Sequence, residues 1–132
     1  MRRIVAALVL PLITHICPAL AADLEPARDA IRRHEYERAV VLLRPLSEAG
    51  DAEASFQLSQ LFRYGRGVAR DLPQACQLLE VAATAGHARA AGGLAAMLES
   101  GECQKSARKA EEWRASAHSA GYAPPAASTN QA

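Results

Sequence analysis

The stretch YGRGVARD, residues 64–71, joins two segments in which apolar residues recur every three or four positions. Phosphate-binding loops and tight turns between helices both use closely spaced glycines. A dinucleotide-binding loop would also need a β-strand before the glycines and a third glycine in the next helix, and the sequence has neither. We therefore interpret the stretch as a turn, in which Gly65 and Gly67 reverse the backbone and Val68 fills the apolar gap between two helices.

The end of this stretch predicts where the second helix begins. Asp71 is a residue type that accepts a hydrogen bond from a free amide in the first helical turn. Gln74 follows at the spacing of a capping box, in which the glutamine side chain reaches back to the amide of the cap residue. Residues 52–64 and 72–85 are thus expected to form an antiparallel helix pair.

This pair is one copy of a repeat of about 36 residues. Shifting the sequence by 36 and then by 35 positions brings Gly50, Gly86 and Gly121 into register. The same shifts align three alanines and three large apolar residues, namely Ala39, Ala75 and Ala110, and Leu42, Leu78 and Trp113. The chain is rich in alanine and poor in β-branched residues, which favours helices over strands. A period of this length indicates stacked helical repeats.

The predicted fold class is therefore all-α, a short α/α solenoid of about two and a half to three antiparallel helix pairs. The pairs are expected at 24–33 with 36–49, 52–64 with 72–85, and 88–99 with 107–120. The three glycines in register are expected just past helix ends, in the left-handed conformation. The solenoid domain is expected to span 22–121, and the tail 122–132, which lacks periodicity, to be disordered.

The first 21 residues have the layout of a secretory signal peptide. A basic start, MRR, precedes an apolar run of 10 residues, and Ala19 and Ala21 fit a signal peptidase that would cut between Ala21 and Ala22. The run is shorter than the roughly 20 residues that span a bilayer; an uncleaved membrane anchor is the alternative. Cys17 lacks the preceding small residues of a lipoprotein cleavage site. The protein is thus expected to be periplasmic or secreted, with no stable membrane span after cleavage.

Cleavage would leave 111 residues, enough for one small domain. Loss of Arg2 and Arg3 leaves 13 basic and 14 acidic side chains, so the net charge becomes −1. Both signs are interspersed and no basic stripe is present, which argues against nucleic-acid binding. Two cysteines remain, Cys76 and Cys103, in an exported and therefore oxidising setting.

The second unit carries a family resemblance. Residues 51–88, DAEASFQLSQLFRYGRGVARDLPQACQLLEVAATAGHA, resemble one complete Sel-one-like repeat, a relative of the tetratricopeptide repeat. The residues that carry the resemblance are Ala54, Leu58, Tyr64, Gly65, Gly67, Val68, Asp71, Ala75, Ala82, Ala83 and Gly86. Residues 34–54 resemble the opening half-repeat of bacterial members, and the third unit is a degenerate copy. The resemblance implies a solenoid without cofactor or enzymatic activity, which acts as an adaptor or assembly subunit for another protein in the bacterial cell envelope.

One pattern favours an enzyme instead. Ser106 and Lys109 have the Ser-x-x-Lys spacing of acyl-serine enzymes, and some cysteine-rich proteins of the resembled family are linked with β-lactam binding. Ser106 aligns with Asp71 at a helix start, however, and Lys109 is expected to be solvated and protonated, which makes it a poor base. The companion Ser-Asp-Asn and Lys-Thr-Gly elements are missing from the sequence. A β-lactam or ester hydrolase using Ser106 and Lys109 is the alternative function.

The remaining candidates for chemistry are histidines and one tryptophan. His34, His87 and His118 show no spacing typical of a metal site, and they are expected to be exposed in two turns and on one helix. Trp113 is expected in the core rather than in a recognition site, because it aligns with two leucines. No metal site is therefore expected.

A binding surface is expected on the first helices of successive pairs, which line the concave side of solenoids of the resembled kind. The candidate residues on 52–64 and 88–99 are Gln57, Gln60, Arg63, Arg89 and Gly93. An ordinary solvated face explains these residues equally well. With so few repeats the groove is short, and the interface is expected to be small.

The stacking of helix pairs also predicts a disulfide between Cys76 and Cys103. Cys76 lies near the start of 72–85, and Cys103 lies in the loop between 88–99 and 107–120. Because successive pairs stack in parallel, this loop should lie beside that helix start. The better-known cysteine-rich members of the resembled family bridge at a shorter spacing, so the pairing follows from stacking alone. The alternative is two unpaired thiols.

Overall fold

The structure is a computed structural model that describes residues 23–104 and 107–123. Over these residues it contains six α-helices and no strand, which confirms the all-α prediction. The helices are α1 (Glu25–Arg32), α2 (Tyr36–Glu48), α3 (Ala52–Tyr64), α4 (Leu72–Thr84), α5 (Ala88–Glu99) and α6 (Ala107–Ser119). Every expected helix is present, and the expected bounds differ from these by no more than about one residue, which is the usual uncertainty of helix ends.

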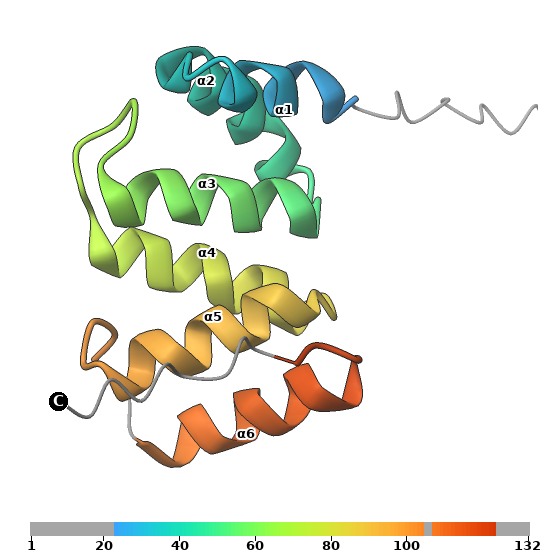
Figure 1. Cartoon of the computed structure of the whole chain (residues 1–132), viewed down its shortest axis with the longest axis vertical. Helices are drawn as coiled ribbons and strands as arrows, with labels where there is room; N and C mark the ends of the chain where they lie inside the picture. The colour runs from blue at the N-terminus through green and yellow to red at the C-terminus, as the bar shows by residue number, and fades with distance from the viewer. Residues whose placement is uncertain (1–22, 105–106, 124–132) are drawn as a thin grey trace, which may run out of the picture.

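The helices stack in the order of the chain, from α1 and α2 at one end to α6 at the other (Figure 1). Each helix packs mainly on the one before it and the one after it. Short loops between successive helices force neighbours to run antiparallel. The short α/α solenoid-like fold is thereby confirmed.

The core consists of two clusters of apolar side chains. One cluster lies among α1, α2 and α3, the other lies among α3, α4, α5 and α6, and Phe62 packs against both. The three aligned alanines Ala39, Ala75 and Ala110 are buried, so neighbouring helices approach closely there. Trp113 packs against the second cluster, as expected from its alignment with leucines.

The glycines that set the repeat register have positive φ angles. The values are +92° at Gly50, +87° at Gly86 and +82° at Gly121. Gly86 shows the local pattern: its amide donates to the carbonyl of Ala83, and the next amide donates to the carbonyl of Ala82. These bonds satisfy carbonyls that the end of a helix leaves free. The expected position of the three glycines, just past helix ends, is confirmed.

The loop 65–71 turns as expected and also packs on the preceding pair. Gly65 ends α3 in the left-handed conformation, with φ +64°. Gly67 has φ +70°, and a Cβ built on it would lie 2.5 Å from the backbone nitrogen of Glu37 at the start of α2. Val68 is partly buried against the cluster of α1, α2 and α3. The loop therefore joins the second helix pair to the first (Figure 1).

Only half of the predicted capping box forms. The Asp71 carboxylate accepts a hydrogen bond from the amide of Gln74 at 3.0 Å, as expected. The Asp71 amide, however, donates to the carbonyl of Phe62 at 3.0 Å. The prediction that Gln74 reaches back to this amide is wrong, because the turn brings the amide onto the end of α3, where it is already satisfied.

The boundary between the domain and the tail needs one correction. Tyr122, which was assigned to the disordered tail, packs against the second core cluster, and its amide donates to the carbonyl of Ala117 at 2.9 Å. Its ring lies over Gly92, where a Cβ would come within 2.8 Å of Tyr122 Cδ1.

The expected signal peptide 1–21 with its cleavage site, and residues 124–132 of the tail, lie outside the described residues. Within the described part of the chain, no helix combines the length and apolar character needed to cross a bilayer.

Candidate interaction site

The first helices of the second and third pairs, α3 and α5, are joined by polar contacts near both ends of α3. Near its N-terminus, Glu53 Oε2 lies 2.6 Å from Nε2 of His87. His87 is the N-cap of α5, and its Nδ1 accepts a hydrogen bond from the Ala90 amide at 3.1 Å. Because Nδ1 accepts, the ring hydrogen of neutral His87 lies on Nε2 and is donated to Glu53. His87 thus holds the start of α5 against α3.

His87 corrects one expectation from the sequence. Its side chain is 14% exposed, whereas an exposed turn residue was expected. The ring stacks on Phe56 with the centroids 4.8 Å apart, and this contact explains its burial. His34 and His118 are exposed, as expected.

Glu53 stays ionised although it is partly buried. Burial raises the pKa of Glu53, but the hydrogen bonds from His87 and Gln57 outweigh burial and hold this pKa below its ordinary value. The Gln57 bond is 2.6 Å long. Arg89 adds a further contact, because its guanidinium lies 4.8 Å from the centroid of the Phe56 ring while the residue itself is exposed. The N-terminal end of α3 therefore carries a fixed carboxylate beside a stacked cation.

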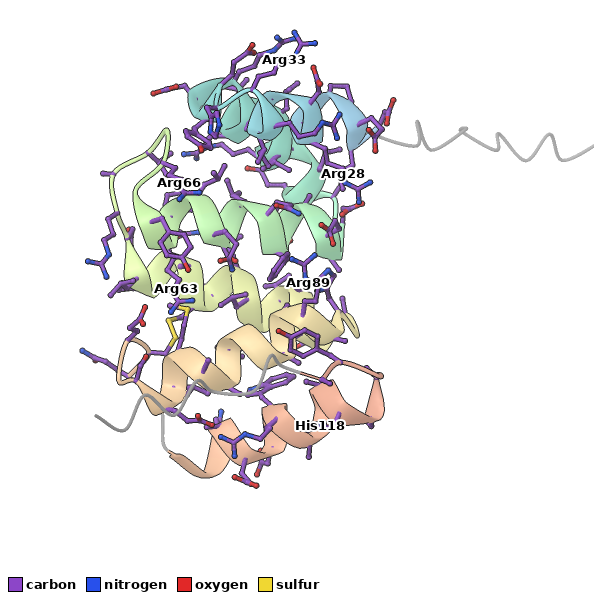
Figure 2. All side chains as sticks on the ribbon, viewed as in Figure 1. Arg28, Arg33, Arg63, Arg66, Arg89 and His118 are labelled. Atoms are coloured by element: carbon purple, nitrogen blue, oxygen red, sulfur yellow. A yellow bond between two sulfur atoms is a disulfide. The ribbon has the colours of Figure 1, made fainter. Side chains whose placement is uncertain are left out.

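Near the C-terminal end of α3, Arg63 forms a two-pronged ion pair with Glu102 in the loop after α5. Nε and Nη2 of Arg63 donate to the carboxylate at 3.0 and 2.9 Å, and Ser100 donates at 3.1 Å. The hydrogen bonds from Arg63 lower the pKa of Glu102, and the same bonds raise the pKa of Arg63. Figure 2 shows Arg63 and Arg89 at the same level of the stack but on opposite sides of the molecule, with the disulfide close to Arg63.

The structure joins Cys76 and Cys103 by a disulfide, with a Cα–Cα distance of 6.0 Å. This distance is ordinary for such bonds. The bond ties the loop after α5 to the first turns of α4, at the edge where the stacking of pairs placed both residues. Cys103 stands 36 positions after Gly67, so the two residues occupy the same place in successive units.

The five candidate binding residues do not form one free surface. We call the contacts Glu53–His87, Phe56–Arg89 and Arg63–Glu102 the α3–α5 seam. Gln57, Gln60 and Arg63 are partly buried along α3, and Arg63 and Gln57 are already bonded to Glu102 and Glu53. Arg89 is exposed. Gly93 faces α4, because a Cβ there would contact Leu79 at 3.6 Å.

The pair suggested for acyl-serine chemistry is described only in part. Ser106 lies outside the described residues, and Lys109 is exposed on α6, as its expected solvation requires. In the described ranges, no group of three His, Cys, Asp or Glu side chains is arranged to hold a metal ion.

Glu53, His87 and Glu102 are the residues whose roles the sequence analysis missed. His87 had a signal, since it stands 36 positions after Asp51, the N-cap of α3. Glu102 had none, because Arg66 occupies the matching place in the second unit. The side chains along the α3–α5 seam are suited to hydrogen bonding and to holding charged or aromatic groups.

No protein-family model matches the chain, and a search of curated proteins finds no significant match.

Proposed function

We propose that the chain is an exported helical-repeat protein of the Sel-one-like type, and that it serves as a non-enzymatic adaptor or assembly subunit for another protein of the bacterial cell envelope. One observation carries the proposal: three helix pairs stack in a row, with α3 and α5 joined along the α3–α5 seam. Helical repeats of this architecture present extended binding surfaces. A surface held by the Glu53–His87 hydrogen bond at one end and by the Arg63–Glu102 ion pair at the other needs little further ordering when a partner binds.

Export is supported by the disulfide and by the first 21 residues. Disulfides persist in oxidising compartments, and the N-terminal pattern of a basic start, an apolar run and small residues is that of a signal peptide. The intact mass of the exported protein is expected to correspond to a chain beginning at Ala22. Retention of Met1 to Ala21 in that protein would contradict cleaved export.

The adaptor role is tested by photo-crosslinking in intact cells. A photoreactive amino acid replaces Gln60, which is half-buried on α3, or Gln77, which is exposed on α4 and serves as the matched control. We expect a discrete adduct in the envelope fraction from position 60 and little or none from position 77. Equal adducts at both positions, or none at position 60, would count against the proposal.

The non-enzymatic part of the proposal is tested separately. Purified mature protein and its Ser106→Ala variant are incubated with a chromogenic β-lactam and with a chromogenic ester. We expect no turnover above buffer for either protein. Turnover that depends on Ser106 would favour the hydrolase alternative.

A further inference from the structure

Two arginines of the loop between α3 and α4 form no direct ion pair with a residue that the structure describes. Arg66 and Arg70 are exposed, and neither forms an ion pair with any residue that the structure describes. The three arginines of the N-terminal helix and the turn after it contrast with them, because each pairs with an acid of α1; these are Arg28, Arg32 and Arg33. Within the described chain, Arg70 acts on Glu102 only at a distance, where its charge helps to lower the pKa of that carboxylate, and most of the loop's cationic charge stays at the surface without a direct ion pair.

Aromatic rings hold one of these guanidinium groups in place. The Arg66 guanidinium lies 5.5 Å from the centroid of Tyr36 and 5.3 Å from that of Tyr64. Arg63 lies 5.4 Å from the same Tyr64 ring, and Tyr64 is 55% exposed. Contact with the ring faces restrains the guanidinium plane and leaves N–H donors at its edge free for a planar acceptor. Figure 2 shows Arg63 and Arg66 on the side of the molecule where α3 ends.

A cavity of about 300 Å³ lies beside the Tyr64 ring, lined by Arg63, Tyr64, Arg70 and Glu102. Glu102 is the acid in its lining, and its carboxylate already accepts hydrogen bonds from Arg63 and Ser100. Nε of Arg70 donates a hydrogen bond to the carbonyl of Arg63 at 3.1 Å, and this bond fixes the Arg70 side chain at the rim of the cavity. The cavity thus carries net positive charge, with donors that nothing in the described chain engages.

We propose that this arginine–tyrosine edge, made of Tyr36, Tyr64, Arg66, Arg70 and the pair Arg63–Glu102, binds an acidic segment of a partner protein. The inference rests on the proposed adaptor role and specifies the chemistry of the partner. Guanidinium groups match carboxylates through two parallel hydrogen bonds. Tyrosine and arginine are also among the residues that most often dominate protein–protein binding energy.

The alternative occupant of a basic surface is an anionic membrane. Recognition of anionic lipid typically uses clusters of about four to eight basic residues, each contributing roughly 1 kcal/mol. The arginine–tyrosine edge has only two arginines outside a direct ion pair among the described residues, beside a shallow, open hollow. A peptide carboxylate fits this geometry better than a flat charged sheet does.

The test uses the mature protein, residues 22–132, labelled with ¹⁵N and titrated with a ten-residue peptide that alternates Glu and Ala. We expect chemical-shift changes at the amides of 65–70 and at arginine side chains, and we expect the binding to weaken as salt is added. The Arg66→Gln and Arg70→Gln variants should each bind about tenfold more weakly, the effect of one lost charge-assisted contact. Arg66→Lys keeps the charge but loses the planar fork, and should fall between. Arg28→Gln, which removes an equal charge from α1 on the opposite side of the molecule (Figure 2), should bind as the wild type does.

Three outcomes would overturn the inference. Equal binding of the peptide in which Gln replaces Glu would show that carboxylates are not recognised. Equal weakening by Arg28→Gln would show that binding depends on net charge alone. Arg66-dependent binding to phosphatidylglycerol vesicles, without binding of the Glu peptide, would assign the edge to a membrane. Each of these results leaves the crosslinking result at position 60 unaffected, so failure of this inference is distinguishable from failure of the adaptor role.

Discussion

At the scale of single residues, a missing side chain decides how the loop 65–71 packs. Gly67 lies against the start of α2, where a Cβ would meet backbone atoms. In the third unit the matching residue is Cys103, which bonds to Cys76 in the first turns of α4. The same position in the repeat therefore reaches the preceding second helix in two ways, by close backbone contact in one unit and by a covalent bond in the next.

We expect Gly67→Ala to lower the free energy of unfolding by more than Gly86→Ala does. Both glycines have positive φ, which costs about 1–2 kcal/mol for a residue with a Cβ. At Gly86 a Cβ would meet open space, whereas at Gly67 it would force the loop away from α2. Chemical denaturation of both variants measures the difference. Losses of equal size would show that the contact between this loop and α2 contributes nothing to stability.

Glu102 gives the stability a predictable dependence on pH. Its hydrogen bonds from Arg63 hold its pKa in the folded protein below the ordinary value. A lowered folded pKa stabilises the fold above the unfolded pKa of about 4.3, and this stabilisation is lost as pH falls through the folded pKa. We expect Glu102→Gln to cost about 1 kcal/mol or less at pH 7 and to flatten the loss of stability below about pH 4.3.

The matched control for this change is Glu112→Gln on α6, where Glu112 is exposed. Urea denaturation from pH 7 to pH 3 compares the two variants with the wild type. The control should follow the wild-type curve at every pH. A Glu102→Gln curve with the wild-type slope below pH 4.3 would contradict the role of the Arg63–Glu102 pair.

At the scale of helices, the repeat predicts where elements lie better than it predicts how they begin. The apolar period and the closing glycines place all six helices, because both follow directly from the geometry of the helix and of its C-terminal turn. The caps depend on where the preceding turn points its amides. Asp71 caps α4 as its residue type suggests, while Gln74 finds its expected donor already bonded to Phe62.

The start of α5 shows the importance of such a cap. His87 accepts from the Ala90 amide, contacts Glu53 and stacks on Phe56, so His87→Ala removes three interactions. His87→Asn keeps a side chain that caps well but loses the reach to Glu53. We expect His87→Ala to lower the free energy of unfolding by about 1 kcal/mol more than His87→Asn, with faster hydrogen exchange in the first turn of α5. Equal losses would show that the Glu53 contact and the stacking on Phe56, and not the cap, stabilise this end.

At the scale of the whole molecule, the stack of pairs follows from the sequence while the α3–α5 seam does not. Stacking requires that each helix bury its apolar stripe on its neighbours in the chain, and this stripe is visible in the repeat. The pairs Glu53–His87 and Arg63–Glu102 join residues 34 and 39 positions apart, and they depend on side-chain direction. Gly93 illustrates the limit: its place on α5 was predicted, yet it faces Leu79.

The stack also explains why the disulfide lies where it does and what it contributes. The third unit lacks the second glycine and the aspartate of the second unit's loop, and Cys103 stands where Gly67 makes its close backbone contact. The bond joins residues 27 positions apart, and for a ring of this size the loss of chain entropy in the unfolded state corresponds to about 3–4 kcal/mol of stability.

We expect the double variant Cys76→Ser, Cys103→Ser to unfold at correspondingly lower denaturant, with α6 losing protection from hydrogen exchange before α3 does. Addition of a reductant to the wild type should reproduce the shift and leave the double variant unchanged. Free thiols at both positions in the exported protein, found by non-reducing peptide mapping, would contradict both the bond and the support that it gives to the third pair.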